Sequence, residues 1–191
     1  LGGIAKGYTG QKLAELFQEY GVSSALVSLG GNIQAIGTKP DGSSWKVGIR
    51  DPKGGQQDYI GVLSVENQAV VTSGGYERYF EEDGETYIHI INPRTGYPAD
   101  GDLLSVTIVS KDGTLADGMS TALYIMGYEK ACQFWRQHRE GFNVILVTDD
   151  GKIHISENLK ENFQTEWDLE MNNCSYKKIC CQQVDYFYRN Q

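Results

Sequence analysis

Apolar residues near the start of the chain recur at helical spacing. Leu13, Leu16, Phe17 and Tyr20 follow the i, i+3, i+4, i+7 pattern of one helix face, and Gly21 stands where such a helix would end. The pattern predicts a helix that follows the Gly-rich start of the chain and ends near Gly21.

Short apolar or alternating runs, bounded by turn residues, follow that helix and predict strands. They lie at 25–29, 33–36, 45–49, 62–65, 69–72, 87–91 and 106–110. Two helices are then predicted at about 115–126 and 129–138, separated by Gly127. A hairpin is predicted from 143–148 and 152–156 around an Asp-Asp-Gly turn. Strands that occur in runs, rather than alternating strictly with helices, favour an α+β fold.

The pattern changes character after about Glu166. Residues 1–166 are long enough for one domain with a sizeable core. Residues 167–191 show no apolar period and are rich in Cys, Gln and Tyr. We therefore predict a domain over 1–166 and a disordered tail outside it over 167–191.

Charge and hydropathy narrow the classes of partner. The net charge of −8 argues against binding to nucleic acid, because an acidic surface repels phosphate backbones. No run of about 18 apolar residues is present, so no segment is predicted to span a membrane. An acidic protein that handles an anionic substrate needs a metal ion or local basic groups to offset the repulsion.

The first candidate for chemistry is the stretch Gly2–Tyr8, which precedes the predicted helix. Glycines there allow backbone N–H groups to approach a phosphate, and Lys6 adds a positive charge. The stretch matches neither a Walker A loop nor a dinucleotide-binding fingerprint. Taken alone, it is equally typical of a glycine-rich helix cap, which is the commoner case.

A second candidate lies in the predicted helix that begins near residue 115. Asp117 and Thr121 are four residues apart and share one face, with Ser120 beside them. A carboxylate with nearby hydroxyls supplies the hard oxygen ligands that Mg²⁺ prefers. The alternative is that Asp117 caps the helix and Thr121 faces the core.

Two further stretches end predicted strands. His89 could act as a base or contact a phosphate, and Arg94 could bind a phosphate or pair with a surface acid. Most single histidines on strands are instead structural. Residues 72–79 suit a ligand-facing turn, or a plain strand connection with an exposed ion pair between Glu77 and Arg78.

Taken together and in this order, the motifs resemble the ApbE family of flavin transferases. The family pattern includes Leu-Gly-Gly-Ile-Ala-Lys-Gly-Tyr, a strand that ends in Leu-Gly-Gly-Asn, and four further motifs. These stand here at 1–8, 29–32, 45–52, 72–80, 89–98 and 116–123. Six motifs in a fixed order make the resemblance specific, and it extends over about residues 1–160.

The resemblance implies an ApbE-like, T-fold-like α+β architecture with mixed or antiparallel sheets and packed helices. It also implies Mg²⁺-dependent transfer of FMN from FAD to a threonine of a target flavoprotein, with release of AMP. Two alternatives stay open: an FAD pyrophosphatase that yields FMN and AMP, and a truncated, non-catalytic flavin-binding protein.

The resemblance further implies roles for individual residues. The metal ligands would be the Gly3 carbonyl oxygen, the Asp117 carboxylate and the Thr121 hydroxyl, with Ser120 near them. A second group would serve the nucleotide: Lys6 and Ile91 fall where the family contacts FAD, and His89 falls in the motif tied to catalysis. Together with Asp117, His89 is the catalytic candidate.

The sequence departs from the family pattern in two places. Asn92 replaces the usual Asp of the His-Ile-Ile-Asp-Pro motif, and the chain starts just after the family's Asp that precedes Leu1. We expect that the family's N-terminal portion, which helps to hold FAD, is lacking, and that this chain by itself transfers flavin poorly. The family context implies an acceptor subunit of a membrane redox complex. It also implies a location in the periplasm or on the outer face of the cytoplasmic membrane, with a lipid anchor on the complete protein.

Overall fold

Seven antiparallel strands form the main sheet of the computed structural model, which describes residues 2–165 and 181–185. Every neighbouring pair in this sheet is antiparallel. In spatial order the strands are β1 (Ala25–Leu29), β2 (Asn32–Ile36), β5 (Ala69–Gly74), β8 (Leu103–Ser110), β9 (Asn143–Thr148), β10 (Lys152–Ser156) and β12 (Cys181–Asp185).

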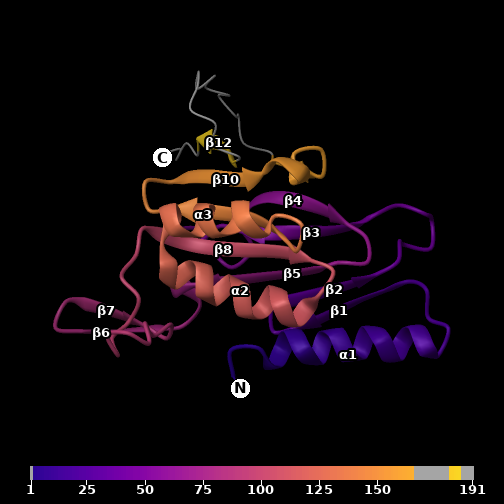
Figure 1. Cartoon of the computed structure of the whole chain (residues 1–191), viewed down its shortest axis with the longest axis horizontal. Helices are drawn as coiled ribbons and strands as arrows, with labels where there is room; N and C mark the ends of the chain where they lie inside the picture. The colour runs from indigo at the N-terminus through magenta and orange to yellow at the C-terminus, as the bar shows by residue number, and fades with distance from the viewer. Residues whose placement is uncertain (1, 166–180, 186–191) are drawn as a thin grey trace.

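Two smaller sheets accompany the main one. The first has the order β11 (Phe163–Gln164), β4 (Tyr59–Val65) and β3 (Trp45–Arg50). The second is the hairpin of β6 (Tyr79–Glu82) and β7 (Glu85–Ile88), which projects from the body at the lower left of Figure 1. Short 3-10 helices, η1 (Gly75–Glu77) and η2 (Glu157–Leu159), follow β5 and β10.

The helices are α1 (Ala5–Glu19), α2 (Gly113–Met126) and α3 (Tyr128–His138), and the last two cover one face of the main sheet (Figure 1). The three-stranded sheet covers the opposite face, so the body has three layers. Alternation along the central strands fills both interfaces: on β8, Val106 and Ile108 pack toward the helices, whereas Val109 packs toward the small sheet.

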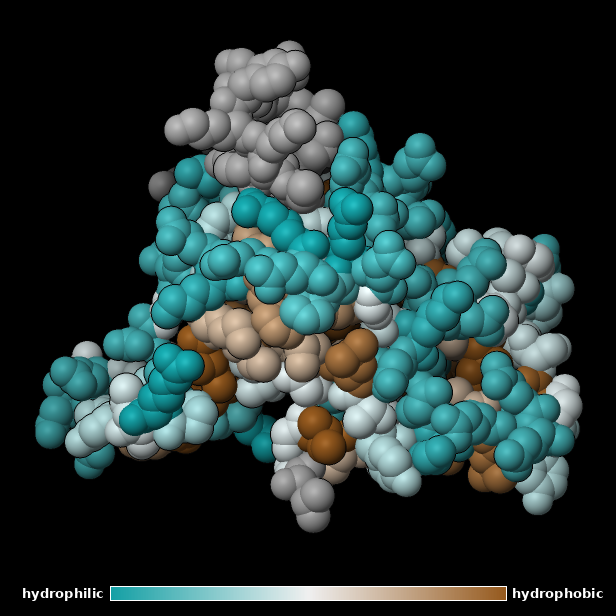
Figure 2. All heavy atoms as spheres, in the orientation of Figure 1, coloured by the Kyte–Doolittle hydropathy of each residue, from teal (hydrophilic) through white to brown (hydrophobic). Residues whose placement is uncertain are grey.

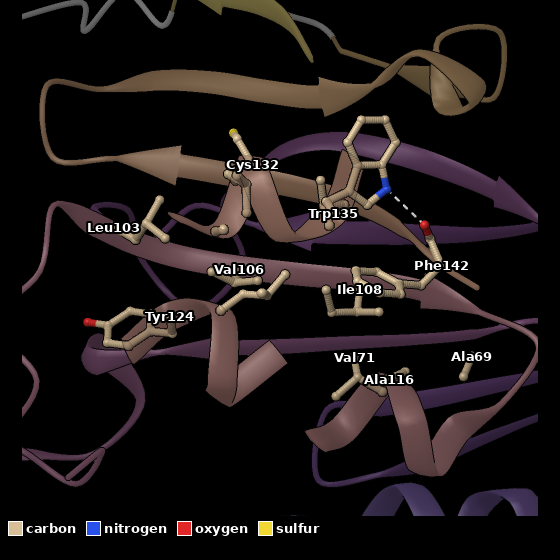
Figure 3. Close-up of a cluster of buried hydrophobic side chains, with 14 of the residues drawn as sticks. Ala69, Val71, Leu103, Val106, Ile108, Ala116, Tyr124, Cys132, Trp135 and Phe142 are labelled. Carbon is tan, nitrogen blue, oxygen red and sulfur yellow. Dashed lines mark hydrogen bonds between the residues drawn. The ribbon is translucent and has the colours of Figure 1, made fainter. Parts of the chain in front are cut away.

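A buried hydrogen bond joins α3 to the segment before β9 in the core on the helix side of the sheet. The Trp135 indole N–H donates to the Phe142 carbonyl oxygen at 2.9 Å, as the dashed line in Figure 3 shows. Both side chains are buried among aliphatic residues of β8 and β9. This polar contact satisfies two groups that would otherwise be costly to bury.

The predicted α+β class is confirmed, as are the two consecutive helices and the hairpin of β9 and β10. Gly127 separates α2 from α3 with φ of 77°, a backbone conformation that glycine adopts without steric cost. The strand predicted over 87–91 is shorter than expected and ends at Ile88. Its partner β6 falls in a stretch that the sequence did not identify as a strand.

The helix predicted from Leu13, Leu16, Phe17 and Tyr20 is confirmed as α1, but its apolar face is only partly buried. Leu16 and Tyr20 are 43% and 82% exposed, and the buried residues of α1 are Gly7, Gly10 and Ala14. Gly7 faces inward because α1 lies directly against α2, where a Cβ at this position would overlap the Gly113 carbonyl oxygen.

The segment predicted as a tail contributes a strand to the sheet. Residues 181–185 form β12 and pair with β10, whose free edge would otherwise carry unpaired backbone groups. The rest of the predicted 167–191 tail lies outside the described residues. In the part of the chain that the structure describes, no helix is long and apolar enough to cross a membrane.

Candidate functional site

Helix α2 carries the predicted metal ligands, and Asp112 is the residue that caps it. The Asp112 carboxylate accepts from the backbone N–H groups of Thr114 and Leu115 at 2.8 and 2.9 Å. Asp117 lies inside the helix, past its first turn, so it does not cap α2. Its side chain is buried, with 6% of the residue exposed. Thr121 follows one turn later on the same face, as the spacing predicted.

Asp117 instead binds the start of another helix. Its Oδ2 accepts a buried hydrogen bond of 2.7 Å from the backbone N–H of Gly7, the third residue of α1. The first four N–H groups of a helix have no partner within it, and a carboxylate there is also favoured by the helix dipole. Asp117 thus ties α1 to α2 across 110 residues of sequence.

Gly7 allows that contact because it has no side chain. A Cβ at this position would overlap the Gly113 carbonyl oxygen and lie 2.5 Å from the Asp117 Cβ. Only glycine therefore permits the two helices to approach closely enough for the backbone to reach the carboxylate. The sequence reading placed Gly7 in a motif but did not identify this contact.

Hydroxyl groups extend the site from Asp117 toward the end of β5. The Ser120 hydroxyl is fully buried and donates to the Asp117 carbonyl oxygen at 2.9 Å. The Ser73 hydroxyl lies 2.8 Å from that of Ser120 and 3.0 Å from that of Thr121. Ser73, at the end of β5 rather than in a turn, is a member of the cluster that sequence reasoning missed.

Two further predicted site residues, Gly3 and Lys6, lie at the start of α1. Gly3 is exposed in the turn before α1, and Lys6 on the first turn of α1 donates from Nζ to the Gly30 carbonyl oxygen at 3.2 Å. Gly30 and Gly31 both have positive φ, which shapes the tight connection between β1 and β2. The Leu-Gly-Gly-Asn motif is therefore brought beside the Gly-rich start.

The oxygen donors around Asp117 are of the kind that Mg²⁺ binds. Among residues 2–165 and 181–185 no group of three or more His, Cys, Asp or Glu could hold a metal ion. Mg²⁺, however, typically binds one or two carboxylates, and waters and substrate phosphates complete its coordination. Here Asp117 offers one carboxylate, and Thr121 offers a hydroxyl one turn later on the same helix face. The Ser120 hydroxyl is already engaged, because it donates to the Asp117 backbone carbonyl oxygen and lies within hydrogen-bond distance of the Ser73 hydroxyl.

The geometry of His89 fixes which ring nitrogen carries a proton. Both the backbone N–H and Nδ1 of His89 lie 3.1 Å from the Arg78 carbonyl oxygen. A carbonyl oxygen only accepts, so Nδ1 carries the proton in this contact. In the neutral ring Nε2 is then unprotonated, and because His89 is exposed this nitrogen is available as a base.

The turn after His89 explains how Asn92 replaces the family's Asp. The Asn92 Oδ1 accepts from the Arg94 backbone N–H at 3.0 Å, and an amide oxygen makes this contact as a carboxylate would. Ile91, which is 47% exposed, bridges to Pro98 at the base of the same turn. Among the described residues, neither His89 nor Ile91 hydrogen-bonds to the Asp117 cluster.

Gly75 connects the two parts of the site. A Cβ at Gly75 would lie 2.9 Å from the Ile88 Cγ2 and 2.9 Å from the Tyr124 hydroxyl oxygen. Ile88 directly precedes His89, and Tyr124 lies one turn beyond Thr121 on α2. The residue before His89 therefore approaches Tyr124, one turn beyond the hydroxyl cluster on α2.

The exposed ion pair between Glu77 and Arg78, one of the two interpretations of residues 72–79, is not what the structure shows. Glu77 instead pairs with Arg50 of β3 at 3.4 Å, and the Arg50 guanidinium lies 4.9 Å from the Tyr76 ring centre. Burial, followed by the nearby Glu77 carboxylate, raises the pKa of Tyr76 to about 12, so its hydroxyl stays protonated at neutral pH.

Comparison with known proteins gives concordant matches. The model of the ApbE family matches residues 1–146. The chain is 43% identical to an FAD:protein FMN transferase of Treponema pallidum and 42% identical to one of Klebsiella pneumoniae. Each match covers 82% of this chain but only 45% and 47% of the relative. The chain thus spans about half the length of these relatives.

Solved structures show the same relationship. The ApbE protein of Thermotoga maritima superposes with a TM-score of 0.77 at 38% identity, over 85% of this chain and 52% of that one. The flavin transferase ApbE of Vibrio cholerae gives a TM-score of 0.72 at 32% identity, over 83% and 50% of the two chains. A variant of the latter with one histidine replaced by glycine is similar as well, with a TM-score of 0.69.

Proposed function

The chain belongs to the ApbE family, and on that premise we propose that it carries the metal and catalytic residues for transfer of FMN from FAD to a threonine of an acceptor flavoprotein, with release of AMP. The observation that carries the proposal is the buried Asp117 carboxylate, held by the Gly7 N–H beside the hydroxyls of Ser73 and Thr121. This cluster adjoins a Gly-rich helix start that suits a phosphate.

The proposed metal ligands are the Gly3 carbonyl oxygen, the Asp117 carboxylate and the Thr121 hydroxyl. Ser120 lies near them. Mg²⁺, when bound, supplies positive charge that offsets the charge developing on the pyrophosphate. Ser120 and Ser73 orient the Thr121 hydroxyl through their short contacts. Lys6 adds a positive charge on the first turn of α1, where it can reach a phosphate oxygen by leaving the Gly30 carbonyl.

His89 is proposed as the base. The acceptor threonine oxygen forms a bond to the FMN phosphorus, the bond from that phosphorus to the bridging oxygen breaks, and AMP leaves with the electron pair. The threonine proton passes to Nε2 of His89, the ring nitrogen that can accept it in the neutral ring, because Nδ1 faces the Arg78 carbonyl oxygen and carries the proton there. Ile91, exposed beside this residue, offers an apolar contact to FAD.

The acceptor is proposed to be a flavoprotein subunit of a membrane redox complex. Support for this part comes from the family alone. The Treponema and Klebsiella relatives are FAD:protein FMN transferases, which act on a protein rather than on a small hydroxyl compound.

The metal assignment is tested by Asp117→Asn with Mn²⁺ as a spectroscopic probe. Asparagine keeps an oxygen that can accept from the Gly7 N–H, so the fold should persist, but the negative charge is lost. We expect Mn²⁺ affinity, followed by electron paramagnetic resonance, to fall at least tenfold. Asp112→Asn makes the same chemical change on the same helix and should leave the affinity unaltered. Equal Mn²⁺ binding by both variants would remove Asp117 from the site.

Product analysis tests the reaction itself. The chain is mixed with FAD, Mg²⁺ and a threonine-bearing acceptor domain, and flavin fluorescence is read on a denaturing gel. Labelling of the acceptor, expected to be weak with this chain by itself, that depends on His89 but not on His138 of α3 supports the proposal. Free FMN without labelling would indicate FAD pyrophosphatase activity instead. FAD binding without either product would indicate a non-catalytic flavin-binding protein.

A further inference from the structure

The hydroxyls of Thr121, Ser73 and Ser120 form a chain of hydrogen bonds that ends at a backbone carbonyl group. Thr121 Oγ1 lies 3.0 Å from Ser73 Oγ, which lies 2.8 Å from Ser120 Oγ. Ser120 Oγ in turn lies 2.9 Å from the Asp117 carbonyl oxygen. All three distances are within the usual range for O–H···O hydrogen bonds, about 2.5–3.0 Å. The chain therefore joins the end of β5 to α2 through hydroxyl groups alone.

The carbonyl end of this chain sets the direction of each proton. A carbonyl oxygen only accepts, so the single hydroxyl proton of Ser120 is donated to Asp117. Ser120 Oγ must then accept from Ser73, because it has no second proton to give. Ser73, whose own proton is now used, must accept from Thr121. The Thr121 proton therefore points toward Ser73, and the reverse direction is excluded.

This direction decides what Thr121 can bind. With its proton taken up by Ser73, Thr121 Oγ1 has only lone pairs left for a ligand, so it can coordinate a cation but cannot donate to a phosphate oxygen. The carboxylate of Asp117, one turn earlier on the same face of α2, is likewise an acceptor. Figure 2 shows that the surface is hollowed between the β6–β7 hairpin and the start of α1, beneath α2, so α2 has open space on this side.

We propose that Ser73 is a positioning residue for the divalent cation: by accepting the Thr121 proton, it holds Thr121 Oγ1 as a lone-pair donor to the metal. The inference rests on the proposed function, which places the cation at Asp117 and Thr121. Threonine in a helix otherwise donates to a carbonyl oxygen three or four residues earlier. For Thr121 the carbonyl four residues earlier is that of Asp117, and such a bond would turn the hydroxyl toward the helix backbone.

Thr72, the residue before Ser73 on β5, supplies a matched control. Its hydroxyl lies 2.8 Å from that of Thr107 on β8, and both Thr72 and Ser73 are partly buried. Successive residues of a strand face opposite sides of the sheet, so Thr72 points away from α2. Thr72→Val and Ser73→Ala each remove one hydrogen-bonded hydroxyl from the same strand, and both should lower the midpoint of urea denaturation. Only Ser73→Ala interrupts the chain to Thr121.

The test measures Mn²⁺ affinity of the whole chain by electron paramagnetic resonance, without FAD. Groups that hold a metal ligand in place typically contribute about 10–100-fold to metal affinity. We expect Ser73→Ala to weaken Mn²⁺ binding about tenfold, Thr72→Val to change it less than about twofold, and Ser73→Thr, which restores a hydroxyl, to recover most of the loss. Unchanged affinity in Ser73→Ala, or an equal loss in Thr72→Val, would overturn the proposal.

A double-mutant cycle separates positioning from a general structural effect. Thr121→Val removes the hydroxyl and keeps the branched shape of the side chain, and it should weaken Mn²⁺ binding at least as much as Ser73→Ala. If Ser73 acts through Thr121, adding Ser73→Ala to Thr121→Val should change the affinity less than about twofold. A further tenfold loss in that background would show that Ser73 acts by another route, which contradicts the proposal.

Asp117→Asn distinguishes failure of this inference from failure of the proposed function. Weaker Mn²⁺ binding in Asp117→Asn, together with unchanged binding in Ser73→Ala, would overturn the role of Ser73 and leave the metal assignment standing. Unchanged binding in Asp117→Asn would remove the cation from this site and overturn both. Losses in Asp117→Asn, Thr121→Val and Ser73→Ala, with Thr72→Val unaffected and the last two losses non-additive, would support the inference.

Discussion

Replacement of Gly7 by alanine should damage the fold and the metal site together. The added Cβ would overlap the Gly113 carbonyl oxygen and approach the Asp117 Cβ to 2.5 Å. The first of these neighbours is backbone, which cannot rotate away, so α1 must shift from α2. That shift would lengthen the 2.7 Å hydrogen bond from the Gly7 N–H to Asp117.

The size of the effect can be built from its parts. Overpacking of a close contact costs about 1–3 kcal/mol. Loss of a buried hydrogen bond to a charged group costs about 1.5–3 kcal/mol. Alanine recovers about 1 kcal/mol through its higher helix propensity. The free energy of unfolding should therefore fall by roughly 1.5–5 kcal/mol, a large part of the stability of a typical domain.

Gly10→Ala supplies the matched control. Gly10 is also buried on α1, one turn later, but a Cβ there would lie 3.7 Å from the Gln34 Cβ, an ordinary contact. That variant should be at least as stable as the parent and gain up to about 1 kcal/mol. Urea denaturation followed by circular dichroism gives both values, and Mn²⁺ binding reports on the site. If the two variants had the same stability, close approach of α1 to α2 would not be the reason for Gly7.

Three further predictions concern other contacts. Asp112→Ala removes the cap of α2 and should lower the free energy of unfolding by about 0.5–2 kcal/mol in urea denaturation, and an unchanged midpoint would contradict the capping role. Trp135→Phe leaves the buried Phe142 carbonyl without its donor and should cost about 1–3 kcal/mol by the same measurement. The hydrogen bond from the Lys152 ammonium, followed by that from the Thr148 hydroxyl, lowers the pKa of Asp150 from 3.8 to about 2. The resulting stability is present above pH 4 and lost as the pH falls toward 2. Because Asp150 is exposed it should amount to less than about 1 kcal/mol, and Asp150→Asn should flatten the acid limb of the stability profile.

Sequence patterns succeeded where the relevant contacts are local. The i, i+4 relation of Asp117 and Thr121 required only a helix, and α2 provides it. The hairpin of β9 and β10 was evident from two apolar runs around an Asp-Asp-Gly turn. The α+β class was predicted because strands occur in runs along the chain. The antiparallel pairing of all neighbouring strands in the main sheet confirms it.

Contacts between residues far apart in the sequence could not be predicted from hydrophobic spacing or neighbouring charges. Leu16 and Tyr20 recur at helical spacing, yet both are exposed. Helix α1 instead buries Gly7, Gly10 and Ala14, and at Gly7 the backbone of α2 comes too close for any side chain. Adjacent charges suggested a pair between Glu77 and Arg78, whereas Glu77 reaches Arg50 on another sheet. Asp117 does cap a helix, but the helix is α1, 110 residues away.

That long sequence separation has a consequence for how the site assembles. Joining Gly7 to Asp117 closes a loop whose entropy cost is on the order of 4 kcal/mol, by (3/2)RT ln n. Against this cost α1 buries mainly glycine and alanine, so it contributes little apolar area. We therefore expect α1 to detach as a local unfolding unit more readily than the strands of the central sheet. Each detachment would expose the Gly7 amide to exchange with deuterium and separate Gly3 and Lys6 from Asp117. Any ligand that contacts both helices would slow that exchange, because it binds only when α1 is docked.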